Sequence, residues 1–341
     1  MKMILKCFFI FCAFVCTSLL VLFVAELWQN GWSFDAKSSD NYEQREVIID
    51  ESFSSLIIGL KSDKLTILPS EGGECRLVTF EKKTRPHTLE VRDGALVLSY
   101  REEKSLYDYI RVFSFAKTYA TLYIPAGHYD ALAVALTTGD VTVDKGLMFG
   151  SVSIAATTGN VEFSADALTD LSVTLSTGNL LISTPRTGAV SIKGTTADVT
   201  ITDSTITSLD LSLATGDTKI TDTTILADAK LKSTTGKSSL TRTTARNLFI
   251  DKSTGSTTLD GVYTDELMRI DATTSRITLN GIDAGEISIK TTSGSVSGSI
   301  LSEKQFLVRS TSGSISLPDS TSGGICRIET TSGSVKLMIG S

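Results

Sequence analysis

The sequence predicts an all-β protein: a single-stack β-solenoid, similar to a parallel β-helix, with about eleven coils of 19–20 residues. Two observations support this: short runs of alternating apolar and polar residues, and a recurring Thr-Thr-Gly motif; a third, an apolar run near the N-terminus, predicts a membrane helix that precedes the β-rich part. We expect a cytoplasmic stub and transmembrane helix at 1–28, a tether at 29–44, a β-rich leading and capping segment at 45–125, and the solenoid repeat domain at 126–341.

The N-terminal apolar run predicts the compartment. The residues from Cys7 to Ala25 carry no charge and are apolar except for Thr17 and Ser18, and the run is long enough to cross a hydrocarbon layer of about 30 Å. Lys2 and Lys6 precede this run and Glu26 follows it, so the positive-inside rule places the N-terminus in the cytoplasm and the solenoid outside. A cleaved signal peptide is the competing interpretation, but the run lacks a small-x-small cleavage site. We therefore expect a single-pass protein of the cell membrane.

Short alternating runs fill the leading segment. EVIID, LTILP, HTLEV and ALVLSY are examples, and turn signals such as SEGGE and RDG separate them. Alternation interrupted by glycine is typical of strands and hairpins. We expect this segment to lead into the solenoid and to cover its first coil.

The Thr-Thr-Gly motif sets the period of the solenoid. Its variants include TTGD, STGN, TTAD and TTSGS, and successive motifs lie 19 or 20 residues apart. A strand on each side of a corner, repeated at a fixed period, is typical of stacked coils. The third position of each motif defines the corner of its coil: Gly139, Gly159, Gly178, Ala197, Gly216, Gly236, Gly255, Ser275, Gly294, Gly313 and Gly333.

The apolar residues keep one phase relative to the corners. Those around Gly178 are Leu171, Val173, Leu175, Leu180 and Ile182. Because strand side chains alternate between faces, we expect these positions to point inward and those between them, such as Thr174, to point outward. Lys252 and Ser233 interrupt the pattern at the inward position closest to the corner, where we expect the side chains to reach solvent.

Composition excludes several functional classes. The formal net charge is −6 and no basic block is present, which argues against nucleic acid as a partner. There are only two histidines, so His-rich metal sites and most His-based catalytic triads are excluded by number. Cys326 has the phase of a core residue and Cys75 precedes the first coil, so we expect both thiols to be free. No cofactor is implied.

A column of hydroxyl residues directly precedes the corners. One interpretation is structural, because Thr suits a strand end and its hydroxyl can bond to the backbone. The other is functional: a regular polar surface that binds a sugar or a cell-wall polymer. The column consists of Thr138, Thr158, Thr177, Thr196, Thr215, Thr235, Thr254, Thr274, Ser293, Ser312 and Ser332.

A second column, of acidic and amide residues, directly follows several corners. Stacked carboxylates could hold Ca²⁺, but Gly-Asp and Gly-Asn are also ordinary turn pairs, and no GGxGxD repeat is present. The column contains Asp140, Asn160, Asn179, Asp198 and Asp217. We favour the turn interpretation and expect no metal site.

Catalysis is not expected either. Polysaccharide-cleaving solenoid enzymes need paired carboxylates, whereas the acidic residues here are scattered or lie at turns. His128 is interpreted as a loop residue without a partner. An aromatic cluster is expected to pack in the leading segment or over the first coil, with a partner surface as the alternative. It contains Tyr107, Tyr109, Phe113, Phe115, Tyr119 and Tyr123.

The chain resembles the bacterial putative-adhesin family of cell-envelope β-strand-repeat domains of unknown function. The resemblance lies in ATLYIPAGHYDALAVALTTGDVTV (residues 120–143) and in corners such as IKTTSGSVSG and RIETTSGSVKL. It spans roughly residues 45–341; TTAD and TTSR depart from it because they lack the corner glycine. The resemblance implies the architecture and an adhesive role, with no catalytic residues.

We therefore expect a non-catalytic, membrane-anchored surface for adhesion or scaffolding. Its partner would be a cell-wall polymer, a surface glycan or an envelope protein. The first alternative is an envelope-stress sensor or assembly partner that docks another membrane protein, and a carbohydrate-active enzyme is the weaker one. The chain ends in VKLMIGS on its last coil without a polar cap, so self-association through that terminal coil is also predicted.

Overall fold

The computed structural model describes residues 42–100 and 118–340 of the protein, and every regular element in them is a β-strand. The predicted transmembrane helix and almost all of the predicted tether lie outside the described residues. Within the described part of the chain, no helix has the length and hydropathy needed to cross a membrane.

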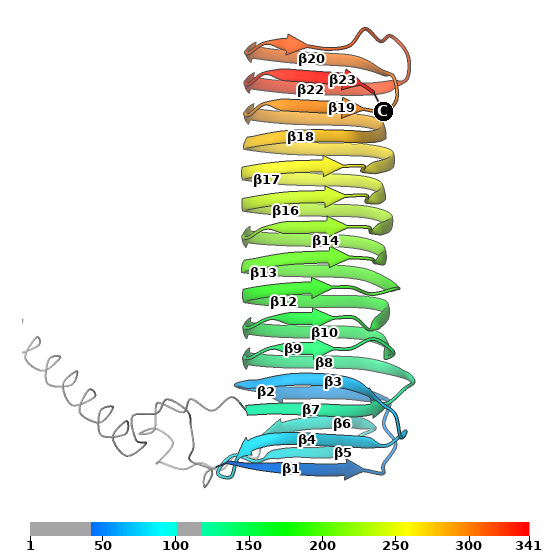
Figure 1. The fold of residues 1–341 in the computed structure, drawn as a ribbon, viewed down its shortest axis with the longest axis vertical. Helices are drawn as coiled ribbons and strands as arrows, with labels where there is room; N and C mark the ends of the chain where they lie inside the picture. The colour runs from blue at the N-terminus through cyan, green and yellow to red at the C-terminus, as the bar shows by residue number, and fades with distance from the viewer. Residues whose placement is uncertain (1–41, 101–117, 341) are drawn as a thin grey trace, which may run out of the picture.

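The strands wind into one rod (Figure 1). The first seven are β1 (Tyr42–Ile49), β2 (Ser55–Leu60), β3 (Asp63–Ser70), β4 (Cys75–Lys82), β5 (His87–Arg92), β6 (Ala95–Tyr100) and β7 (Thr118–Pro125). The middle of the rod contains β8 (His128–Thr138), β9 (Val141–Val143), β10 (Met148–Thr158), β11 (Val161–Phe163), β12 (Asp166–Ile182), β13 (Thr187–Thr202), β14 (Thr205–Thr215) and β15 (Thr218–Thr221). The rest are β16 (Thr224–Thr241), β17 (Thr244–Asp260), β18 (Tyr263–Ser293), β19 (Val296–Ile300), β20 (Lys304–Ser312), β21 (Ile315–Ser316), β22 (Gly324–Ser332) and β23 (Val335–Ile339).

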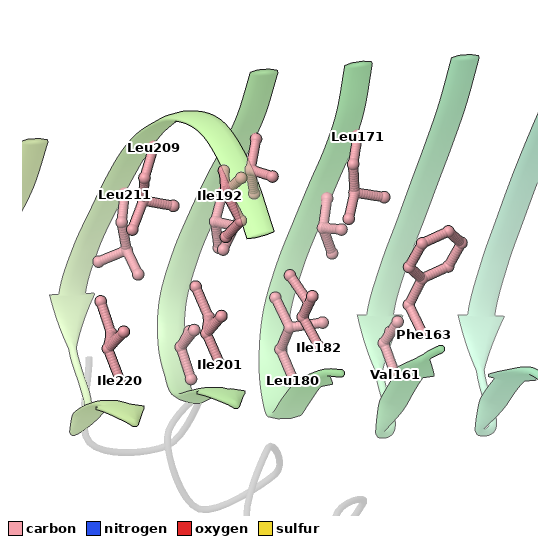
Figure 2. Packing of buried hydrophobic residues seen from close by; sticks show 14 of the residues in the cluster. Val161, Phe163, Leu171, Leu180, Ile182, Ile192, Ile201, Leu209, Leu211 and Ile220 are labelled. Atoms are coloured by element: carbon pink, nitrogen blue, oxygen red, sulfur yellow. The ribbon is translucent and has the colours of Figure 1, made fainter. Parts of the chain in front are cut away.

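Successive coils pair in parallel and in the predicted register. In β12 and β13, Leu171 lies beside Val190 and Val173 beside Ile192. The inward positions around Gly178 are at most 1% exposed, whereas Thr174 is exposed. Figure 2 shows the inward side chains of neighbouring coils stacked in rows between the two strand layers. The predicted all-β solenoid and its phase are therefore confirmed.

At the N-terminal end, the order of the stack differs from the order of the chain. The coil made by β2 and β3 pairs in parallel with β8 and β9 on one side and with β6 and β7 on the other. Antiparallel strands then close this end: β4 pairs with β7, β1 with β4, and β5 with β6. The stack thus begins inside the segment expected to lead into it.

The C-terminal end is also interleaved, which corrects one expectation. The last coil in the sequence, β22 and β23, inserts between β18–β19 and β20–β21 (Figure 1). VKLMIGS therefore does not lie on the outermost coil. β20 and β21 form the distal tip instead. The two coils can exchange positions because they have the same phase, so either can stack in parallel on β18–β19.

The expectation that Lys252 and Ser233 reach solvent is wrong. Lys252 is only 1% exposed, and its Nζ donates hydrogen bonds to the carbonyl oxygens of Gly236 (2.7 Å) and Ser256 (3.1 Å). Its neighbours in the stack, Ser233 and Ala272, are small, which leaves room for the lysine chain. Ser233 is itself buried.

Both described cysteines are free and buried. Cys326 is fully buried in β22, between Ile287 and Phe306, as its phase predicts. Cys75 begins β4 in the cap at the other end of the rod, so the two thiols lie far apart (Figure 1).

Candidate functional site

The corners hold the coils in close contact, and glycine makes this possible. Gly159 has a φ of 139°, and a Cβ placed on it would lie 1.9 Å from the carbonyl oxygen of Gly139 in the preceding coil. Glycine is thus required both for the positive φ and for the contact. The two corners without glycine have a small residue three positions earlier: Gly194 precedes Ala197, and Ala272 precedes Ser275. Ala197 and Ser275 are buried.

The hydroxyl column lies on the surface beside these corners. Every predicted member is exposed. The members are in register from coil to coil, for example Thr158 between Thr138 and Thr177, and Ser332 between Ser293 and Ser312. No hydrogen bond between described residues uses a hydroxyl of this column, so the backbone-bonding interpretation has no support and the hydroxyls face solvent.

A second hydroxyl column, which the sequence reasoning missed, lies one residue before the first. Its members are exposed except Ser176, which is half-buried, and one coil has Ala214 instead. The sequence indicates this second column through the first of the two threonines in the Thr-Thr-Gly motif. The second column contains Thr137, Thr157, Ser176, Thr195, Thr234, Ser253, Thr273, Thr292, Thr311 and Thr331.

A shallow groove of about 540 Å³ is lined by the first members of the second column, Thr137, Thr157 and Ser176. Its outward positions hold Gly59, Ala135 and Ala155, whose small side chains leave the groove open. Tyr100 and Lys61 also line it. Later coils hold longer residues at the same phase, such as Lys193 and Lys232.

The acidic and amide column is a structural ladder. The amide N–H of Asn160 donates to Asp140 Oδ1 (2.8 Å), and the N–H of Asn179 donates to Asn160 Oδ1 (3.1 Å). The N–H groups of Asp217 and Lys237 donate in the same way to Asp198 and Asp217, at 2.7 Å each. Four of the five side chains, those of Asp140, Asn160, Asp198 and Asp217, thus accept a hydrogen bond from the backbone of the next coil. Among the described residues, no group of His, Cys, Asp and Glu has a metal-binding arrangement.

A buried ionic cluster joins the N-terminal cap to the solenoid. His87 of β5, Glu81 of β4 and Asp63 of β3 are each at most 2% exposed. His87 Nδ1 lies 2.5 Å from Glu81 Oε2, and His87 Nε2 lies 3.5 Å from Asp63 Oδ2. The hydroxyl of Tyr100 in β6 donates to Asp63, and Arg45 of β1 lies 3.6 Å from Glu81.

Electrostatics favour the charged form of this cluster. Burial alone would lower the pKa of His87, but the hydrogen bonds and charges of Asp63 and Glu81 raise it to about 9. The cluster lines a cavity of about 100 Å³. Because its residues come from five strands and bond mainly to one another, the arrangement suits a structural link. Sequence reasoning missed it, since strand pairing in the cap is not visible in the repeat.

Some of the remaining residues singled out in the sequence lie within the described part of the chain, and others lie outside it. His128 is exposed, but it begins β8 and is not a loop residue. In the aromatic cluster, Tyr119 stacks on Phe80, and Arg76 lies over the ring of Tyr123. These contacts place the two tyrosines in the packing of the cap. Tyr107, Tyr109, Phe113 and Phe115 lie outside the described residues.

Comparison with known proteins gives a family and several similar folds. The model of the Toastrack DUF4097 family matches residues 53–243 and 236–341. A "putative lipid binding protein" from Parabacteroides distasonis is 15% identical over 77% of this chain and 98% of its own, with a TM-score of 0.46. A "putative adhesin" from Bacteroides fragilis is 11% identical over 88% and 98%, with a TM-score of 0.32. No curated protein matches this chain significantly.

Proposed function

This chain belongs to the Toastrack DUF4097 family, as its corner motifs indicated, and we propose that it is a non-catalytic binding surface held outside a cell membrane. The observation that carries this proposal is the hydroxyl column. Its members are exposed, in register, and unused by the hydrogen bonds of the described fold.

The chemistry of the column favours a ligand that itself repeats. Each hydroxyl can both donate and accept a hydrogen bond. Neighbouring coils place these groups about 4.8 Å apart, the spacing of paired strands. A surface glycan or a cell-wall polymer presents many hydroxyls along one chain, so many weak contacts can form together. The second column widens the same polar face.

Anchoring would come from the apolar run at residues 7–25, which lies outside the described residues. The described chain enters the rod at β1, in the capped end opposite the tip (Figure 1). With the run in a membrane, the capped end would face that membrane and the columns would extend away from it.

The test compares two sets of isosteric substitutions in the full chain in detergent. Thr177, Thr196, Thr215 and Thr235, each changed to Val, remove four stacked hydroxyls and keep the β-branched shape. The control changes Thr142, Thr200, Thr258 and Thr278 to Val on the outward face of the second strands. We expect only the column variant to lose most of its co-sedimentation with insoluble peptidoglycan.

Other outcomes would change the proposal. Equal sedimentation of both variants, or none by the wild type, would remove the column as a site for this polymer. Crosslinking in cells that recovered only membrane signalling proteins would favour a sensor. Turnover of a polysaccharide by the full chain would overturn the non-catalytic assignment.

A further inference from the structure

The outermost coil at the distal tip is paired on one side only. Among the described residues, β20 pairs with β22 alone and β21 with β23 alone. The opposite edge of β20 therefore presents backbone donors and acceptors without a strand partner. Such an edge can pair with a further strand.

The hydrophobic core is also open at this tip. Phe306, Val308 and Leu317 are half-buried, and Ile315 is 44% exposed. Their counterparts one coil inward are buried; Ile328, for example, is 0% exposed. The tip thus combines a free edge with uncovered apolar side chains, and burying them would be favourable by about 25 cal/mol per Å².

The two longer segments outside the described residues, 1–41 and 101–117, adjoin strands at the other end of the rod. Residues 101–117 connect β6 to β7, and their two fixed ends allow an excursion of about 30 Å at most. The coils between β7 and the tip span roughly 50 Å at 4.8 Å each. Residues 1–41 lead into β1, also at the capped end, and contain the apolar run of the proposed anchor.

The sequence of β20 is complementary to itself. A two-fold axis perpendicular to the rod makes the edges of two copies antiparallel. Centred on Leu307, the axis places Leu307 opposite Leu307 of the second copy and Phe306 opposite Val308. Gln305 then faces Arg309, and Lys304 faces Ser310, so no like charges meet. Apolar cross-strand pairs of this kind stabilise a sheet.

We propose that the distal tip binds a second copy of this chain, through antiparallel pairing of β20 about a two-fold axis at Leu307. The contact is one coil wide, so the dimer depends on concentration and is not obligate. The two rods are collinear, with their capped ends at the far extremes. If the proposed anchoring holds, the dimer connects two apposed membranes.

The test uses Leu307, which is 49% exposed and can be changed without opening the core. In the full chain in detergent, Leu307→Asp places two carboxylates face to face on the axis. We expect the mass measured by light scattering to fall by half relative to the wild-type dimer. Leu226→Asp is the matched control, because Leu226 is 56% exposed in the middle of the rod; it should leave the dimer intact.

A mixture of Leu307→Asp and Leu307→Lys chains should restore the dimer, because opposite charges then meet on the axis. A wild-type chain that stays monomeric at all concentrations would overturn the proposal. So would a Leu307→Asp chain that dimerises like Leu226→Asp. A monomer whose tip crosslinks to a different protein would identify another occupant and also overturn it.

Clustering of vesicles that carry the full chain tests whether the dimer connects two membranes, independently of whether the dimer forms in detergent. The proposal expects clustering by the wild type and loss of clustering by Leu307→Asp. A dimer in detergent without clustering of vesicles would leave the tip contact standing and overturn its extension to two membranes, whereas a full chain that does not stay with the vesicles on flotation would overturn the proposed anchoring alone.

Discussion

The two ends of the rod differ in how the unpaired edge of the outermost strand is protected. At the N-terminal end, antiparallel strands cover the first coils, and the edge strand β1 exposes Glu43, Arg45 and Glu46. Charged side chains on an edge oppose further pairing. At the distal tip, the edge strand β20 has Phe306–Leu307–Val308 at its centre and no cover.

The difference shows that the interleaving of coils and the capping of the stack by additional strands are independent features of the fold. Both ends place one coil out of chain order, β2–β3 at one end and β22–β23 at the other. Interleaving secures a coil between two neighbours, but it leaves an outermost coil exposed. Only the N-terminal end adds strands that do not follow the repeat. The tip therefore has the features of an interface and the capped end those of a closed terminus.

The largest expected effect comes from opening the interleaved coil at the tip. Ile328 is fully buried between Ile289 and Val308. Ile328→Asp buries a charge without a partner and should cost several kcal/mol, since neither neighbour can pair with it. Hydrogen exchange should increase across residues 304–340 and stay unchanged in the cap. Arg327→Asp, on the exposed outward face, is the control, and equal exchange in both variants would contradict the interleaved order.

Breaking the ionic cluster tests the opposite end. His87→Leu leaves Asp63 and Glu81 buried without the imidazolium between them, and should destabilise the cap by about 3 kcal/mol. We expect a lower Tm and faster exchange in β1, β4 and β5, while the tip stays protected. His128→Leu changes the other, exposed histidine and should be nearly silent. A cap as stable in the first variant as in the second would show that the cluster is not a structural link.

The middle of the rod was predictable from the sequence, and the two ends were not. Period and phase placed Val173 in the core and Thr174 on the surface, because both follow from local alternation. The exchange of β22–β23 with β20–β21 leaves period and phase unchanged, so nothing in the repeat signals it. The cluster around His87 depends on strand pairings outside the repeat, and burial of Lys252 depends on small residues in neighbouring coils. Binding of a ligand by the hydroxyl column stays a prediction.

Raising the pH should weaken the capped end specifically. The pKa of His87 is raised from an ordinary 6.5 to about 9 in the fold, so its contribution is fully present below pH 6.5. It is lost as the pH rises through 9, because the folded state then also gives up the proton. The total loss is about 3 kcal/mol. Hydrogen exchange in β4 and β5, corrected for its intrinsic pH dependence, should therefore become faster over this pH range. The His87→Leu variant should show no such increase, because it has no imidazole to titrate.

An effect of similar size and opposite sign is expected in the middle of the rod. Burial lowers the pKa of Lys252 from an ordinary 10.5 to about 8, although the charge of Asp217 opposes the shift. Between these values the unfolded chain keeps a proton that the folded chain has lost, so stability rises with pH. We expect protection in β16 and β17 to increase between pH 8 and 10.5, while the cap weakens. Lys252→Met should abolish this increase, because Met fills the space without a titrating group. A similar increase in that variant would mean that another group is responsible.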